Sequence, residues 1–315
     1  MSDAALPIVP TLDVGEPRQL SAFGRALLRS GTGLFGAIVL GLIVLSAILA
    51  PLISPYDPTK QDLSARLTPP LFFGGSTEHI LGTDQLGRDL LSRLLQGARV
   101  SIAVGLFVVL IAGIFGIAMG LLAGYRGKFT DSVIMRVADM QLAFPGILLA
   151  LVILYALGPS MRLVIIVLSI NGWMIYARVT RSFVLSLRKS EYIEAAEISG
   201  AGPFRTMWRH ILPNLTSPLL TLGVLEFARI ILAEAALSFL GYGVQPPDAS
   251  WGLIIAQGQD YLTSAWWIVV IPGIVISITV LSANLLSSWL RIYTDPKQRD
   301  RQRGWKNWQP EKDPA

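Results

Sequence analysis

The sequence predicts an all-α integral membrane protein with six transmembrane helices, and two observations lead to this fold class. Of 315 residues, 52% are hydrophobic and only 15% are charged, whereas a soluble domain typically carries about 25% charged residues. Apolar stretches of roughly 20 residues, enough to cross a bilayer as a helix, recur along the chain. The chain has no cysteine and two histidines, which excludes disulfides and thiolate metal sites and disfavours a histidine metal cluster.

The chain begins with a polar tail, residues 1–33, in which acidic residues are interspersed with arginines. This pattern is not typical of a cleaved signal peptide, so we expect the first apolar run to remain as a membrane span. Residues 34–53 form this first predicted span, because they carry no charge and are ended by Pro51 and Pro55.

A polar loop, residues 54–99, separates the first two spans and is expected to be extracytoplasmic. Leucines recur at helical spacing near its end, which predicts an amphipathic segment at the membrane surface leading into the second span; they are Leu90, Leu91, Leu94 and Leu95. We expect Asp84, Arg88 and Asp89 to form surface ion pairs that fix this loop, and a direct role in function is the alternative.

Residues 100–290 are predicted to form a core of five further spans. The second span, residues 100–125, carries small residues that let helix backbones approach closely, so we expect packing rather than a pore lining; they are Gly105, Gly113, Gly116, Gly120 and Gly124. A short basic loop, residues 126–136, follows. The remaining spans are predicted at residues 140–157, broken by Pro145-Gly146, and at 163–180, 217–237 and 266–290.

The fifth span carries Glu226, Arg229 and Glu234, which are costly inside a bilayer. Glu226 and Arg229 are three residues apart, so they share a helix face and can form an ion pair. Lining of a pathway is the alternative for these two residues. Glu234 lies off that face, and we expect it to contact another subunit or to line the pathway.

Residues 191–213, EYIEAAEISGAGPFRTMWRHILP, are polar although apolar stretches lie on both sides. Ser190 can cap a short helix over residues 191–199, which Gly200, Gly202 and Pro203 would end. A second short helix is predicted over residues 204–211, with Pro213 in the first turn of the next helix. Two small helices joined by a glycine turn form a knob that suits docking onto a soluble partner. The stretch holds no nucleophile paired with a base.

This stretch resembles the signature of the permease subunits of bacterial ATP-binding-cassette (ABC) importers. The matching residues are Glu194-Ala195-Ala196, Gly200 and Leu212-Pro213, although His210 stands where the signature expects isoleucine. Residues 79–101 resemble the same region of the dipeptide, oligopeptide and nickel importer permeases, and so do residues 233–252 and 271–291. The extended loop before the second span is similar to that of the C-type subunit. The resemblance implies a type I ABC importer permease fold.

The resemblance also implies partners and a role for the knob. ATPase coupling would fall to Glu194, Ala195, Ala196, Gly200, Gly202, Leu212 and Pro213. The chain has no G-x-x-x-x-G-K-[ST] phosphate loop, so it would bind no cofactor, and ATP would bind to separate subunits. The expected assembly contains a homologous second permease, two ATPases and an extracytoplasmic binding protein, surrounded by lipid and without nucleic acid. Relatives carry peptides, nickel chelates or glutathione, and the sequence does not distinguish among these solutes.

The distribution of basic residues predicts the topology. No Lys or Arg occurs between Arg229 and Arg291, so residues 242–265 should face outward, whereas the basic tail, residues 291–315, should face the cytoplasm. The knob is flanked by basic residues and falls on the cytoplasmic side. Six spans then place both termini in the cytoplasm of a bacterium, with the chain in its inner membrane. The net charge of +5 fits this topology.

Two other classes of protein remain as alternatives. An ion-coupled secondary transporter could use Glu226, Arg229 and Glu234 as a relay, but no inverted repeat is visible in the sequence. A structural or assembly protein of the membrane would not need a docking knob. Co-purification of an ATPase separates all three classes.

Overall fold

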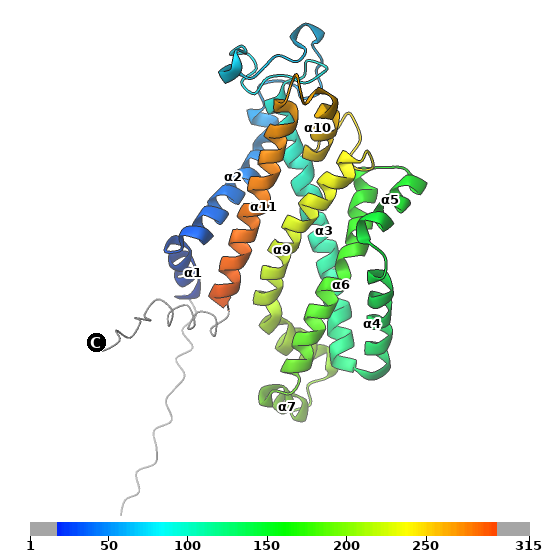
Figure 1. The fold of residues 1–315 in the computed structure, drawn as a ribbon. Helices are drawn as coiled ribbons and strands as arrows, with labels where there is room; N and C mark the ends of the chain where they lie inside the picture. The colour runs from blue at the N-terminus through cyan, green and yellow to red at the C-terminus, as the bar shows by residue number, and fades with distance from the viewer. Residues whose placement is uncertain (1–17, 295–315) are drawn as a thin grey trace, which may run out of the picture.

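The computed structural model describes residues 18–294, and within them the fold is helical, with no β-strand. The N-terminal part of the predicted tail (1–17) and the end of the C-terminal tail (295–315) lie outside the described residues. The long elements are α2 (Gly31–Ile53), α3 (Leu90–Arg126), α6 (Met161–Leu187), α9 (Leu212–Phe239) and α11 (Trp267–Thr294). These five helices lie alongside one another in a bundle (Figure 1).

The centre of the bundle is α3, which packs most extensively against α6 and also contacts α2 and α9. Glycines on α3 allow this approach. A Cβ atom added at Gly116 would lie 2.2 Å from the carbonyl oxygen of Trp173, and one added at Gly120 would lie 2.5 Å from that of Ala177. Both distances are too short for non-bonded atoms. The predicted packing role of the glycine stripe is therefore confirmed at these positions.

The third predicted span is built differently from the expectation. Residues 126–136, predicted as a loop, are helical from Lys128, because α4 runs over Lys128–Leu142. Ion pairs from Asp131 to Arg181 and from Asp139 to Arg178 hold α4 against α6. The chain then bends by 81° into α5 (Gly146–Leu157). At 1.5 Å per residue, α5 is only about 18 Å long and cannot cross a bilayer alone.

Four described helices are long and apolar enough to cross a membrane: α2, α3, α6 and α11. The bent pair of α4 and α5 counts as a fifth span if the two helices cross together. With its 28 residues, α9 is also long enough, but it carries three charged residues and is not among these candidates. The chain is thus a multi-pass membrane protein with four to five candidate spans, where the sequence predicted six.

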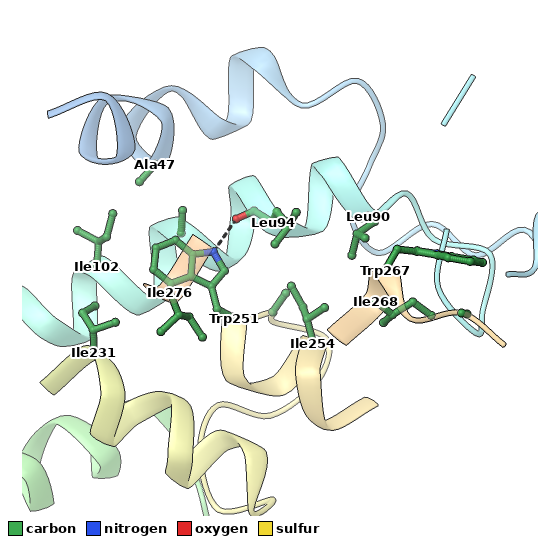
Figure 2. Close-up of a cluster of buried hydrophobic side chains, with 13 residues drawn as sticks. Ala47, Leu90, Leu94, Ile102, Ile231, Trp251, Ile254, Trp267, Ile268 and Ile276 are labelled. Carbon is green, nitrogen blue, oxygen red and sulfur yellow. Dashed lines mark hydrogen bonds between the residues drawn. The ribbon is translucent and has the colours of Figure 1, made fainter. Parts of the chain in front are cut away.

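One end of the bundle is closed by residues 54–89, which include η1 (Leu63–Ala65) and η2 (Leu71–Phe73), and by α10 (Trp251–Gly258) and η4 (Gln259–Tyr261). Trp251 is buried among apolar side chains of α3, α9 and α11, and its Nε1 donates to the carbonyl oxygen of Leu94 at 3.1 Å (Figure 2). Trp267 Nε1 donates to the carbonyl oxygen of Thr83 at 3.1 Å. The two loops, residues 54–89 and 242–265, therefore form one packed cap, here called the outer cap after the side of the membrane that the sequence predicts for it.

The segment before the second span differs from the prediction in two ways. Leu90 is the first residue of α3, so the predicted surface helix is instead the first turns of a 37-residue helix that Asp89 caps. The expected surface ion pairs are buried: Arg88 Nε donates to Asp84 Oδ2 at 2.7 Å, and Arg93 donates to the same oxygen. Both arginines also donate to Gln257 of α10, at 3.1 and 2.8 Å. These contacts thus tie the loop to the start of α3 and to α10.

Candidate functional site

The predicted knob lies at the end of the bundle opposite the outer cap (Figure 1). Its first helix is α7 (Glu191–Ile198). Ser190 occupies the position before this helix, but its hydroxyl donates to the carbonyl oxygen of Leu187, so the predicted cap bond does not form. Gly200 has a φ of +86°, a conformation that is costly for residues with a Cβ. The predicted glycine turn is therefore confirmed.

The second half of the knob is joined to the bundle without a break. The helix predicted over residues 204–211 is a short α8 (Pro203–Arg205) followed by one π-helical stretch, η3 (Thr206–Ile211). This stretch continues directly into α9 at Leu212, and Pro213 lies in the first turn of α9 as predicted. The second half of the knob and α9 are thus one continuous helical element.

The first helix of the knob, α7, is anchored by one buried side chain and by a polar contact. Ile193 of α7 is fully buried and packs in a cluster with Leu121 of α3, Val184 of α6, and Met207 and Leu215. In addition, the hydroxyl of Tyr125, at the end of α3, donates to Glu197 Oε1 at 2.8 Å. The knob is therefore fixed to the ends of the bundle helices.

The predicted coupling residues lie at the surface of the knob and at its junction with α9. Glu194, Ala195, Gly200, Gly202 and Pro213 are exposed, whereas Ala196 and Leu212 are partly buried.

Three large apolar side chains on the same knob were not singled out from the sequence. Ile198, Phe204 and Trp208 are 88%, 71% and 53% exposed. The rings of Phe204 and Trp208 lie 5.9 Å apart. Their signal in the sequence is the presence of large apolar residues within an otherwise polar stretch, which marks an interaction surface when they are exposed.

The predicted pairing of Glu226 with Arg229 is confirmed. Arg229 Nε donates to Glu226 Oε2 at 2.8 Å, and a terminal guanidinium nitrogen lies 2.7 Å from the same oxygen. The two side chains differ in burial, because that of Glu226 is 7% exposed and that of Arg229 is 49% exposed. The Arg229 guanidinium therefore lies at the surface of α9, and the Glu226 carboxylate is buried.

Glu234 does not lie where the sequence suggested. Its side chain is fully buried within the chain, so the expectation that it contacts another subunit or lines a pathway is wrong. Its two carboxyl oxygens accept from Ser101 Oγ of α3 at 2.9 Å and from Ser238 Oγ at 2.6 Å. Ser250 Oγ donates to Ser238 Oγ at 3.1 Å. Glu234 thus joins α3, α9 and the start of α10.

A bundle of apolar helices with four to five candidate spans and a helical knob at one end defines a multi-pass membrane protein. The chain belongs to the family of binding-protein-dependent transport system inner membrane components, which matches residues 116–300. Residues 19–70 match the N-terminal TM domain of oligopeptide transport permease C. The chain is therefore a non-catalytic permease subunit of an ABC importer, in which a separate subunit hydrolyses ATP.

Curated relatives are similar over nearly their whole length. The di/tripeptide transport system permease protein DppC of Pseudomonas aeruginosa is 42% identical over 90% of this chain and 94% of that protein. The dipeptide transport system permease proteins DppC of Escherichia coli K12 and of Haemophilus influenzae are 42% and 36% identical, over 88% and 94% of this chain and 93% and 99% of the relatives. The resemblance inferred from the motifs is therefore confirmed.

Proposed function

We propose that the chain is the C-type permease of an ATP-driven importer of short peptides. The observation that carries the proposal is the similarity, over at least 93% of each relative, to permeases named for dipeptides or di/tripeptides. The match of residues 19–70 to oligopeptide transport permease C supports the assignment to the C type. In this proposal the chain forms half of the translocation pathway.

The knob is the surface that couples transport to ATP hydrolysis. Ile193 fixes it to the bundle, while Glu194 and Ala195 are exposed on α7. The exposed trio of Ile198, Phe204 and Trp208 supplies an apolar patch that a groove on an ATPase subunit would bury. The turn at Gly200 sets the angle between the two halves of this surface. ATP binds to the ATPase subunits, and this chain binds no cofactor.

The full assembly contains a homologous second permease, two ATPases and an extracytoplasmic binding protein. The chain crosses the bacterial inner membrane six times, with α4 and α5 together as the third span and α9 as the fifth. Burial of α9 among other helices supports its place in the membrane despite its charges. Both termini and the knob lie in the cytoplasm, and the outer cap faces outward.

The proposal is tested by co-expressing the chain with its neighbouring permease and ATPase genes and purifying the complex in mild detergent. The Phe204→Ser and Trp208→Ser variants should insert normally but retain much less ATPase, and dipeptide uptake into proteoliposomes should fall in parallel. Phe129→Ser is the matched control, because Phe129 is 81% exposed on α4, outside the knob. Full ATPase retention in both knob variants, or a wild-type complex that transports no peptide, would contradict the proposal.

A further inference from the structure

A cleft of about 580 Å³ lies between α6, α9 and α11, in the half of the bundle nearer the knob. Its wall includes polar side chains from two helices: Asn214, Ser217, Thr221, Arg291 and Thr294. A second groove, of about 630 Å³, lies between α2, α3 and α9 and is lined almost entirely by apolar residues. Lipid or apolar protein surface suits the second groove, whereas the polar wall of the cleft, at the knob end of the bundle, suits water or solute.

The cleft points toward the intramembrane ion pair. Leu222 and Leu225 line it, and Arg229 lies four residues beyond Leu225, on the same face of α9 and about one turn further from the knob. The Arg229 side chain is 49% exposed. A guanidinium in the middle of a membrane helix is too costly to face hydrocarbon. This face of α9 therefore meets a polar environment.

The charges around the cleft are cationic. Arg291 lies on its wall and Arg229 beyond its inner end, and none of the described residues lining the cleft is acidic. Glu226 is buried, whereas Arg229 is half exposed. Arg229 Nε donates to Glu226 Oε2 and one terminal nitrogen lies 2.7 Å from the same oxygen, which holds the guanidinium in place and leaves its other terminal nitrogen to donate elsewhere. A group with this geometry recognises a carboxylate.

We propose that this cleft is the wall that the chain contributes to the solute pathway, and that Arg229 binds the carboxylate of the passing solute there. The inference rests on the proposed function, in which the solute is a short peptide with a C-terminal carboxylate. Arg291 extends the same attraction toward the cytoplasmic mouth. Glu226 is a positioning residue that orients Arg229 and does not itself meet the solute.

The chain contains no cysteine, so a single introduced cysteine can show whether water-soluble reagents reach the cleft and which charge is favoured there. Leu225→Cys, in the assembled complex with cysteine-free partners, should react with membrane-impermeant methanethiosulfonate reagents added from the cytoplasmic side. The anionic sulfonatoethyl reagent should react roughly tenfold faster than the cationic trimethylammonium reagent, because Arg229 lies within about 6 Å of this position. Leu220→Cys, on the apolar groove of the same helix, is the matched control and should not react with either reagent.

Two further variants test whether Arg229 causes the faster reaction of the anionic reagent. Combining Leu225→Cys with Glu226→Gln and Arg229→Gln removes both charges without leaving a buried carboxylate unpaired, and the two rates should become nearly equal. Combining Leu225→Cys with Arg229→Lys retains the charge and should retain the preference. A dipeptide at saturating concentration should slow labelling during turnover, whereas ATP alone should not.

The outcomes separate this inference from the proposed function, because dipeptide uptake is measured on the same proteoliposomes. Normal uptake with an unreactive Leu225→Cys, or with equal rates for the two reagents, would contradict the role of the cleft as a pathway wall. The importer assignment would then stand. Reaction at Leu220→Cys equal to that at Leu225→Cys would also contradict the role of the cleft. Absence of peptide uptake by the unmodified complex would count against the proposed function instead.

Discussion

At the scale of single residues, Glu226 and Arg229 are unequally buried, and this inequality has an energetic consequence. Removing Arg229 leaves a carboxylate buried without a counter-charge, which typically costs about 3–5 kcal/mol. Removing the charge of Glu226 leaves a cation that is already half exposed. We therefore expect Arg229→Met to lower the yield and thermal stability of the purified complex much more than Glu226→Gln.

The double variant Glu226→Gln with Arg229→Met should recover most of the stability lost in Arg229→Met, because no unpaired charge stays buried. The yield of intact complex and its thermal unfolding midpoint in detergent are the measurements. Equal losses in both single variants and no recovery in the double variant would show that the pair does not stabilise the fold.

Gly200 permits a second prediction at this scale. Its φ of +86° costs a β-branched residue about 1–2 kcal/mol, so Gly200→Val should distort the knob. Uptake and ATPase association should fall while membrane insertion stays normal. Gly200→Asn should be milder, because asparagine tolerates this conformation better. Gly41→Val is the control for bulk, since Gly41 lies in α2, outside the knob, and a Cβ there meets no atom within 4 Å. Unchanged uptake in Gly200→Val would remove the turn from the coupling mechanism.

Residue partners were predictable from the sequence only where they are local. Glu226 and Arg229 lie three apart on one helix, so spacing alone indicates their contact. The partner of Glu234 on α3, Ser101, is 133 residues away, and only the folded bundle brings the two together. Burial of Asp84 and Arg88 likewise depends on α10, which is distant in sequence.

At the scale of elements, close packing of α3 on α6 depends on small residues. Gly116→Ala would place a methyl group 2.2 Å from a backbone carbonyl oxygen of α6, and such overpacking typically costs about 1–3 kcal/mol. We expect a lower thermal unfolding midpoint for the purified complex. Gly41→Ala on α2 is the matched control, because a Cβ there meets no atom within 4 Å. Equal midpoints for the two variants would contradict the packing role of Gly116.

The long apolar helices were predictable from the sequence because composition and length decide them. The predicted spans at residues 34–53, 100–125 and 163–180 fall within α2, α3 and α6, and the one at 266–290 begins one residue before α11. The form of the third span was not predictable from the sequence, because ion pairs to α6 hold the polar helix α4 in the bundle. Continuity of η3 with α9 was also missed, since Pro213 is compatible with both a helix start and a continuing first turn.

At the scale of the whole molecule, the proposed topology places the knob and the outer cap on opposite sides of the membrane. Ser199 and Thr263 are both exposed, in the knob and in the outer cap respectively. In a chain without other cysteines, Thr263→Cys should react with an impermeant thiol reagent in intact spheroplasts. Ser199→Cys should react only after the membrane is broken. The reverse labelling pattern would invert the topology.

The continuity of η3 and α9 also has a mechanical consequence. From Thr206 to Phe239 the backbone runs as helix without a break, with a π-helical start and Pro218 inside it. In the proposed function, a displacement of the knob is therefore transmitted to α9 directly, and Arg229 lies on the helix that receives it. Near the other end of α9, Glu234 binds Ser101 of α3, so that end stays attached to the bundle while the end at the knob moves.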